Sequence, residues 1–398
     1  MLTQTAALFL DAYRELNAKR MFWIVLALSL FVVAVFALVG INANGLTILW
    51  FEIPSLYNTR LIPPAFFYKL TFANLGVGWW LNWFGIVLAL VSTAAIYPDF
   101  VAGGSVDLYL SKPISRLRLF LTKYLTALLF VALQVLLFAA ASFLVIGLRA
   151  GEWDARVFLA VPLVLLVFSY LFSVCALLGV LTRSTIASLL LTILFWLLTA
   201  GLHGGEVVLL LVRTAGDIET RAYQSNFASL DRQADQLTAR VASGDAAAAP
   251  ELDVARQRRR DLEAKKAASD PRRHNVATAH TITHALMTLL PKTAETNALL
   301  SRWLGIAVNP VEEERLDERD RFIAARSAGN STGNTPFGGG WFSAFRDRTE
   351  VRMNDSEVRR DVTATLNARP VSWVLGTSLA FEAVCLSLAA WIFCRRDY

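Results

Sequence analysis

Six long runs of apolar residues most constrain how this chain can fold. A helix needs about 20 predominantly apolar residues to cross the hydrocarbon core of a bilayer. The runs lie near residues 21–43, 76–97, 119–147, 157–181, 186–206 and 371–393. Only 18% of the 398 residues are charged while 55% are hydrophobic, so much of the apolar surface must face lipid. The sequence therefore predicts an all-α, polytopic membrane protein with six transmembrane helices.

The end of the fifth run can be interpreted in two ways. The motif GLHGGE (201–206) interrupts the apolar residues, and VVLLLV then continues them. The motif is compatible with the outer membrane interface, where polar residues meet water. It is equally compatible with a kink inside a longer helix.

The short loops differ in their content of lysine and arginine, and this asymmetry predicts the orientation. Cytoplasmic loops are the richer in these residues. One side holds ten of them, namely Arg14, Lys19, Arg20, Lys112, Arg116, Arg118, Lys123, Arg183, Arg395 and Arg396. The other side holds four, namely Arg60, Lys69, Arg149 and Arg156. We therefore expect a multi-pass protein of the cytoplasmic (inner) membrane, with both termini in the cytoplasm and the long loop 213–370 outside.

Changes in composition divide the chain into three parts. Residues 1–212 form a membrane domain that contains spans one to five. Its leader, TQTAALFLDAYRELNAKR, places its apolar residues on one helical face, which predicts an amphipathic N-terminal helix at the membrane surface or an ordinary juxtamembrane helix. Residues 213–370 form a large extracytoplasmic, mainly helical insertion. Residues 371–398 form the sixth span and a cytoplasmic tail.

The insertion carries a heptad-like seam. Its apolar residues repeat at alternating spacings of four and three, at Tyr223, Phe227, Leu230, Ala234, Leu237 and Val241. This spacing predicts a coiled coil, and SGDAAAAP (243–250) breaks it, so we expect a helical hairpin over 217–270 that ends at Asp270–Pro271. Arg259 weakens the seam of the second arm. Residues 276–308 are too short in apolar content to span and predict re-entrant or interfacial helices. Alternation over 349–366 allows a small strand pair.

Several kinds of chemistry lack support in the sequence. His280 and His284 are spaced i, i+4, but the carboxylate of an HExxH metal motif is missing, so an interfacial polar face is the favoured interpretation. No GxxxxGK[ST] segment is present, and no metal, cofactor or catalytic site is predicted. The net charge is +6, but the 38 lysines and arginines are divided between the mixed-charge loop and the membrane-flanking positions. They do not form one basic face, so we expect no nucleic-acid partner.

The segment GGSVDLYLSKPISRLRLF (103–120) is short, half-polar and sharply bounded between the second and third apolar runs. Gly103 and Gly104 allow a turn, Ser105 is a suitable N-cap, and Lys112–Pro113 ends the helix. The residues between them form a short amphipathic helix with apolar Val106, Tyr109 and Leu110 and polar Asp107. Arg116 and Arg118 then anchor the third span at the headgroups. The alternative is a simple connecting turn.

This segment resembles the cytoplasmic loop of type-2 ABC exporter permeases. The positions that match are Gly104, Ser105, Asp107, Leu110, Ser111, Lys112, Pro113, Ser115, Arg116 and Lys123. The tail FCRRDY is also similar to the end of such permeases. The resemblance covers roughly residues 1–210, 276–308 and 371–398, and the hairpin is an insertion relative to it. Many members carry glutamates just ahead of the glycine, where this chain has Phe100, Val101 and Ala102.

The resemblance implies a function and its partners. Residues 104–116 would be the coupling helix that docks on a separate ABC ATP-binding subunit, so that ATP acts through the partner and the permease is not itself an enzyme. Two permeases, as a homodimer, and two ATPases would form the exporter, and a periplasmic partner could engage the hairpin. The alternative is a membrane-anchored scaffold or sensor that acts through its extracytoplasmic hairpin.

Glu382 lies midway along the sixth apolar run. A charge at the bilayer centre costs about 2.5–3.5 kcal/mol on insertion scales, so this carboxyl group should face protein or a water-filled cavity. Its expected partners are Gln134 of the third span or the hydroxyl groups of the fifth. A protonated carboxyl that makes an interhelical hydrogen bond is favoured over a group on the transport pathway, and the pair Glu382 and Gln134 remains the candidate for such a pathway.

Overall fold

A computed structural model describes residues 20–54, 58–60, 62–98, 115–245, 247–307, 318 and 355–395. The described residues are mostly helical, and six of their helices are long and apolar enough to cross a membrane. These helices are Met21–Leu38, Pro64–Pro98, Arg116–Ala150, Ala155–Thr182, Thr185–Ala242 and Val371–Arg395. The expected number of membrane helices and the mainly helical class are therefore confirmed. The expected N-terminal amphipathic helix and residues 103–114 lie outside the described residues.

The second membrane helix begins earlier than the sequence predicts. It consists of α3 (Pro64–Thr71), η1 (Phe72–Gly85), whose backbone is widened to i→i+5 hydrogen bonding, and α4 (Ile86–Thr93). The expected start at residue 76 is wrong because Lys69 breaks the apolar pattern. The structure compensates this charge, since Lys69 Nζ lies 2.6 Å from Glu152 Oε1 and 2.7 Å from Asp154 Oδ2.

A small antiparallel sheet follows the first membrane helix, which the all-α prediction missed. Helix α2 (Arg20–Leu38) leads directly into β1 (Val39–Ile41), β2 (Gly45–Ile48) and β3 (Phe51–Pro54), paired in that order. Gly40 lies opposite Thr47, and a Cβ atom at Gly40 would clash with the Thr47 hydroxyl. The β-branched residues at the end of the first apolar run therefore form a strand instead of the last turn of a helix.

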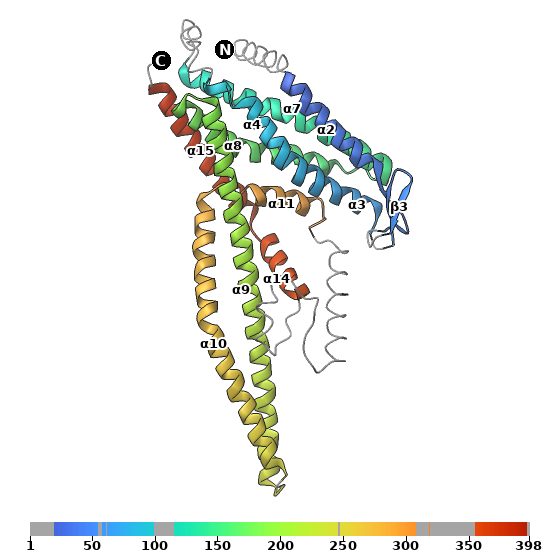
Figure 1. Cartoon of the computed structure of the whole chain (residues 1–398), viewed down its shortest axis with the longest axis vertical. Helices are drawn as coiled ribbons and strands as arrows, with labels where there is room; N and C mark the ends of the chain where they lie inside the picture. Colours follow the sequence, from blue (N-terminus) through green and yellow to red (C-terminus); the bar gives the residue numbers. More distant parts are fainter. Residues whose placement is uncertain are drawn as a thin grey trace. The chain divides into compact units, whose positions relative to one another are not determined.

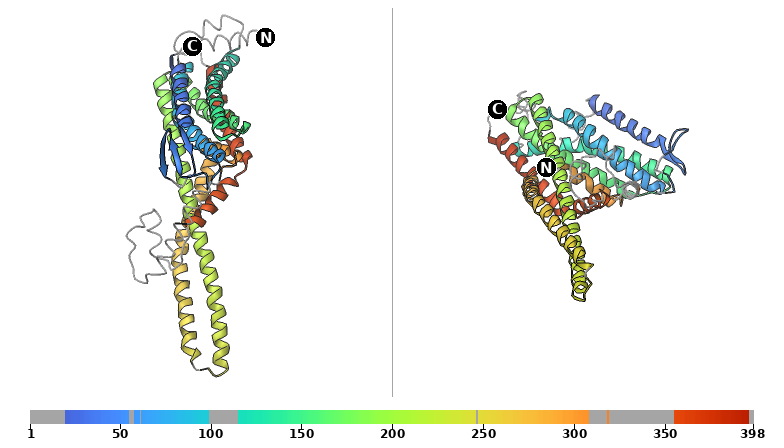
Figure 2. Two further views of the ribbon diagram at one scale, coloured as in Figure 1. Left: turned by 90° about the vertical axis from the view of Figure 1, so that its right-hand side faces the viewer. Right: turned by 60° about the horizontal axis from the view of Figure 1, so that its bottom comes forward.

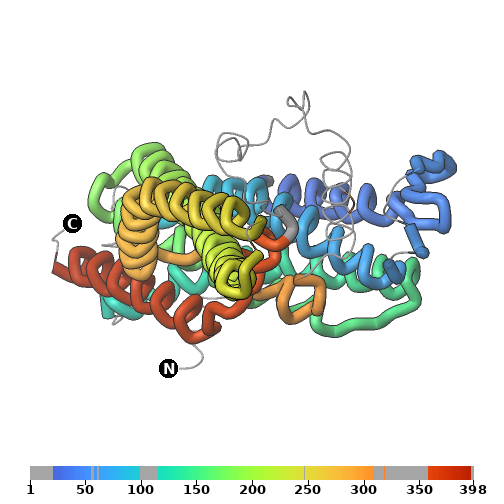
Figure 3. Tube along the Cα trace, turned by 90° about the horizontal axis from the view of Figure 1, so that it is seen from below, coloured from blue at the N-terminus to red at the C-terminus, as the bar shows by residue number. Residues whose placement is uncertain are grey.

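The core of the membrane helices is built around α8 (Ala160–Thr182), which follows the short helix η2 (Ala155–Leu159). It packs against α7 (Arg116–Ala150) and α15 (Val371–Arg395), and its residues Phe168, Tyr170, Leu171 and Phe172 are completely buried. With 35 residues, α7 is about 52 Å long, so it must tilt or extend beyond a hydrocarbon core of about 30 Å. Figure 3 shows α15 and the strands at opposite edges of this part of the protein.

The chain forms two compact units. The first comprises Met1–His203, Met287–Val311 and Arg369–Tyr398, and the second comprises Gly204–Leu286 and Glu312–Ala368. Helix α9 (Thr185–Ala242) contributes to both and runs without interruption through GLHGGE, so this motif lies inside a longer helix. Helix α11 (Thr293–Trp303), which lies inside the expected insertion 213–370, packs against α8 and α15 and therefore groups with the membrane helices.

In the second unit, α9 and α10 (Ala248–Leu289) lie side by side and antiparallel (Figures 1 and 2). Ion pairs join the two arms, since Arg259 Nε lies 2.7 Å from Asp231 Oδ1 and Arg273 Nη2 lies 3.2 Å from Asp217 Oδ1. Arg259, which weakens the apolar seam, thus links the arms through its charge.

The expected helix end at Asp270–Pro271 is wrong, because α10 continues through Pro271 to Leu289. An interior proline costs about 3 kcal/mol through its missing N–H and its clash with the preceding turn. The ion pair of Arg273 with α9, only two residues beyond, helps to hold the helix together at this point.

Two further segments of the insertion were expected to have other structures. Of the residues 276–308 expected to form re-entrant or interfacial helices, 276–307 are described. They form the last turns of α10, a break at 290–292 and then α11, so the first of these helices is the end of the hairpin arm α10. Residues 355–367, expected to hold a strand, form helix α14 (Asp355–Asn367). The strand prediction is wrong there because Val358 and Val362 are buried at the i, i+4 spacing of a helix.

Candidate functional site

Glu382 lies in the middle of α15 and is buried where three membrane helices meet. Its Oε1 atom accepts a hydrogen bond of 2.8 Å from the Tyr124 hydroxyl of α7, and its Oε2 atom accepts one of 3.0 Å from the Ser169 hydroxyl of α8. All three side chains are buried. The carboxyl group therefore faces protein, as its cost in lipid requires.

The partners expected from the sequence are not those that the structure provides. The Gln134 side-chain amide instead donates to the backbone carbonyl of Phe22 at 3.4 Å. In the fifth membrane helix, the Thr192 hydroxyl donates to the Ser188 carbonyl of its own helix. The prediction was wrong because hydropathy locates a helix but does not tell which of its faces meets which neighbour.

The geometry around Glu382 can satisfy both protonation states of the carboxyl group. When the group is ionised, the hydroxyls of Tyr124 and Ser169 both donate to it. When it is protonated, it can donate to one of them, because each hydroxyl has a backbone carbonyl as an alternative acceptor. The Tyr124 oxygen lies 2.9 Å from the carbonyl of Ser169, and the Ser169 hydroxyl lies 2.8 Å from that of Leu166. The site can thus take up or lose a proton without leaving a buried polar group unsatisfied.

A row of packed aromatic rings leads from this site to the ends of the membrane helices. The Tyr124 ring stacks on Phe172 with centroids 5.3 Å apart, and Phe172 lies 6.1 Å from Tyr97. Tyr97 contacts Phe120 at 4.8 Å, and Phe120 contacts Phe393 at 5.7 Å. The row thus connects the Glu382 site with Tyr97 at the end of the second membrane helix and with Phe120 near the start of α7.

Most of the predicted coupling residues lie outside the described part of the structure, namely Gly104, Ser105, Val106, Asp107, Tyr109, Leu110, Lys112 and Pro113. Arg116 is described, and it begins α7. The Ser115 side chain caps this helix by accepting from the Arg118 amide. The guanidinium of Arg116 donates to the Cys394 carbonyl at 3.3 Å, so the start of α7 is tied to the end of α15.

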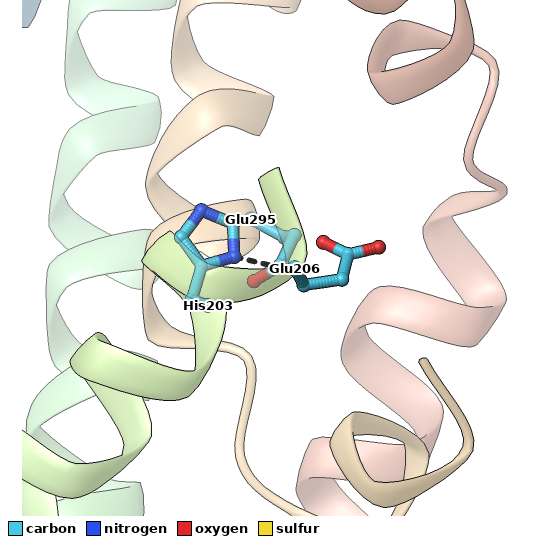
Figure 4. Close-up of side chains that lie close together, drawn as sticks. All are labelled: His203, Glu206 and Glu295. Atoms are coloured by element: carbon cyan, nitrogen blue, oxygen red, sulfur yellow. Dashed lines mark ion pairs between the residues drawn. The ribbon is translucent and has the colours of Figure 1, made fainter. Parts of the chain in front are cut away.

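A second polar cluster, which the sequence analysis missed, lies around the start of α11. Figure 4 shows the ion pair in which His203 Nδ1 lies 3.3 Å from Glu295 Oε1. The same oxygen lies 3.0 Å from Arg369 Nη1. Lys292 is almost completely buried, and its Nζ atom donates to the Thr377 hydroxyl and lies 4.3 Å from the centroid of the Trp373 ring. The signal that could have revealed this cluster is the presence of Lys292 and Glu295 within an otherwise weakly polar segment.

Burial and neighbouring charges shift the pKa values in this cluster. Burial lowers the pKa of Lys292 to about 8, although the Glu295 charge opposes the shift. Burial alone would raise the pKa of Glu295, but the hydrogen bond and charge of His203 and the charge of Arg369 hold that pKa below its usual value. The cluster joins α11 to α15 directly, since the Lys292 amide also donates to the Ser378 hydroxyl at 2.9 Å.

In the second unit, His280 and His284 face a carboxylate that their sequence context does not reveal. Glu206 Oε1 lies 3.6 Å from His280 Nε2 and 3.4 Å from His284 Nδ1, and the Glu206 side chain is completely buried. Arg213 Nη1 lies 3.2 Å from the other ring nitrogen of His280. The histidines therefore belong to a polar contact between α9 and α10, with a cation already beside one of them.

Comparisons with protein-family models, with curated proteins and with solved structures found no match to this chain.

Proposed function

We propose that this chain is the permease subunit of an ATP-driven ABC exporter. It pairs through a cytoplasmic coupling helix in residues 103–116 with a separate ATP-binding subunit and moves a substrate across the cytoplasmic membrane. The proposal draws on the sequence resemblance of residues 103–125 and on the six apolar helices. The observation that carries it furthest is a pair of contacts made by described residues next to this segment, in which Tyr97 donates to α7 and Arg116 donates to α15.

The described contacts support a mechanical role for the segment. Before it, the Tyr97 hydroxyl donates to the Phe120 carbonyl of α7 at 3.1 Å. At its last residue, the Arg116 guanidinium donates to the Cys394 carbonyl of α15. A close-packed interior transmits displacement instead of absorbing it. Movement of the segment by a partner would therefore act on the two helices that carry Tyr124 and Glu382.

The rest of the assembly follows from the proposed role. Two permease chains form a homodimer with two ATP-binding subunits, and both termini of the permease lie in the cytoplasm. In this orientation the hairpin of α9 and α10 is extracytoplasmic, where it can meet a periplasmic partner. ATP binds to the partner subunit alone.

Co-purification tests the pairing. The tagged chain is extracted from membranes of its source, and the proteins that elute with it are identified and assayed for ATP hydrolysis. We expect an ABC ATP-binding subunit to co-elute with the wild type. The combined substitution Val106→Asp, Tyr109→Asp and Leu110→Asp should release it, because three charges replace the apolar side of the segment.

The matched control is Ser111→Asp, which adds a charge to the same segment outside its apolar side and should retain the subunit. Membrane insertion is checked for every variant by resistance to carbonate extraction. If the triple variant inserts and still binds an ATP-binding subunit with undiminished hydrolysis, residues 103–116 are a connecting turn and the proposed coupling is wrong.

A scaffold or sensor that acts through the hairpin is the second candidate. It is favoured by the length of α9 and α10, of 58 and 42 residues, because the resemblance to exporter permeases does not cover residues 217–270. A wild-type chain that inserts normally and co-elutes with no ATP-binding subunit would favour this candidate.

A further inference from the structure

The turn between β2 and β3 carries an apolar tip that the proposed transport function does not use. Trp50 is 85% exposed, Phe51 74% and Leu49 51%. Two-residue turns of β-hairpins usually hold glycine, asparagine or aspartate, because these residues tolerate a positive φ. Here Leu49 adopts a φ of 57°, a region that bulky residues rarely occupy. Large apolar side chains thus stand where turn geometry and contact with water both favour small or polar ones.

The sheet that carries the tip has one polar end and one apolar end. At the β1–β2 turn, Glu52 accepts hydrogen bonds from the side-chain amides of Asn42 at 2.7 Å and Asn44 at 3.4 Å. At the other end, Ile48 pairs with Phe51 across the strands and leads into Leu49–Trp50. The two ends of this sheet are therefore suited to different surroundings.

The apolar end lies at the level where the first membrane helix ends. The Leu49 amide donates to the carbonyl of Leu38, the last residue of α2, at 3.2 Å. Leu38 is itself exposed, as are Phe31 and Val35 of the same helix, whose residues Met21–Leu38 have a mean hydropathy of 2.8. The tip therefore continues the exposed apolar surface of α2.

Polar side chains and a second tryptophan also lie near the end of α2. The Tyr68 hydroxyl donates to the β1 carbonyl of Val39 at 3.0 Å and accepts from Arg149, which lies in the last turn of α7. Trp153 follows α7, is 55% exposed and lies so close to Gly147 that a Cβ atom there would clash with its ring. Basic residues and tryptophan gather at the headgroup level of membrane proteins, where a ring can be partly apolar and partly wet.

We propose that the β2–β3 turn is a lipid anchor, which inserts Leu49, Trp50 and Phe51 into the membrane interface beside the end of α2. Its partner is the lipid surface itself, at the boundary between headgroups and acyl chains. The anchor fixes the depth of α2, while the polar β1–β2 turn remains in water. This role is independent of whether the chain couples to an ATP-binding subunit.

A fluorescent probe at each end of the sheet tests the anchor. The environment-sensitive dye NBD is attached to Trp50→Cys and, as the matched control, to Ala43→Cys, which lies in the exposed β1–β2 turn. The three native cysteines, Cys175, Cys385 and Cys394, are first replaced by alanine. The full chain is reconstituted into vesicles of phosphatidylcholine and phosphatidylglycerol after size-exclusion chromatography has shown that each variant is monodisperse.

We expect the probe at position 50 to emit at shorter wavelength, to be quenched by lipids with a nitroxide high on the acyl chain and to resist aqueous iodide. The probe at position 43 should show the reverse. Equal iodide quenching at both positions would overturn the proposal, because the tip would then lie in water. Blue-shifted emission at position 50 without quenching by the nitroxide lipids would also overturn it, because a protein surface would then cover the tip.

Discussion

At the scale of single residues, the membrane part of this protein places a buried carboxyl group between two hydroxyl groups. Glu382 is hydrogen bonded to the hydroxyls of Tyr124 and Ser169, each of which has a backbone carbonyl within reach as a second acceptor. Hydroxyl groups can reverse their hydrogen-bond direction, whereas an ammonium group cannot. The arrangement therefore holds three helices together in either protonation state.

Two substitutions at this position separate a structural role from a role on the transport path. We expect Glu382→Gln to assemble and transport nearly as the wild type does. The amide oxygen can still accept from one hydroxyl, and the amide N–H can donate to the other hydroxyl, whose own hydrogen then goes to its backbone carbonyl. Glu382→Leu should lower the thermal midpoint by an amount that corresponds to about 1–3 kcal/mol, because it removes the acceptor between α7, α8 and α15. The measurements are thermal unfolding in detergent and export in vesicles. Normal stability with abolished export in Glu382→Gln would instead place the residue on the path.

The Glu295 cluster should make stability depend on pH. The pKa of Glu295 is lowered in the folded chain, so its contribution is fully present above the unfolded value near 4.5 and is lost as the pH falls through the folded value. Glu295→Gln should therefore lower the thermal midpoint strongly at pH 7, by the equivalent of about 3–5 kcal/mol for a broken buried ion pair. The difference from the wild type should shrink at pH 4 and below.

The control for this experiment is Glu263→Gln, which breaks an exposed pair with Arg259 and should cost about 0.3–0.5 kcal/mol. A pH-independent difference between wild type and Glu295→Gln would show that Glu295 acts through packing and not through its charge.

At the scale of elements, the paired helices α9 and α10 are joined by apolar contact and by spaced ion pairs. Their largest apolar cluster lies near the tip and contains Leu237, Leu252 and Ala255. Farther along, Asp231–Arg259 and Asp217–Arg273 link the arms. Exposed pairs of this kind contribute about 0–1 kcal/mol each, so the pairing of the arms depends on many small terms spread along their length.

Deletion of residues 217–270, with a short Gly/Ser linker between the remaining ends, tests whether the membrane helices need this hairpin. We expect insertion and binding of the ATP-binding subunit to persist, because the buried core of the membrane helices contains none of the deleted residues. Membrane fractionation and co-purification measure the two properties. Loss of export with ATP hydrolysis retained would assign the hairpin to substrate or to a periplasmic partner, whereas loss of the protein from the membrane would contradict the prediction.

At the scale of the whole molecule, the excess of lysine and arginine on one side of the spans predicts the orientation. Cysteines are introduced singly at Ser243, Ser331 and Ser111 in the cysteine-free background. In intact cells, we expect an impermeant maleimide to label positions 243 and 331 but not 111. Position 111 should become reactive only after the membrane is permeabilised, and that labelling is the control for its accessibility. Labelling of position 111 in intact cells would reverse the orientation.

The number and approximate place of the membrane helices can be predicted from the sequence, because about 20 consecutive apolar residues are a local property. The sequence also predicts that Glu382 must avoid lipid and that α9 carries an apolar seam, since both follow from the residues of one helix. The end of the first helix and the start of the second were missed for a physical reason. The strand after Leu38 is stabilised by pairing with β2, and Lys69 is neutralised by Glu152 and Asp154 across the fold.

Which side chains contact one another could not be predicted in this way, because it depends on how the helices pack. The Glu382 site joins side chains of three helices. Ser169 is 45 residues from Tyr124 and 213 residues from Glu382 in the sequence, and their hydrogen bonds depend on how each helix is rotated about its axis. The same holds for Lys292, Glu295 and Arg369, whose burial is tolerable only because they lie near one another and near Trp373. Apolar side chains of similar volume can pack against many partners, so hydropathy does not predict how a helix is rotated about its axis. The buried polar contacts require particular partners and therefore favour one arrangement of the helices.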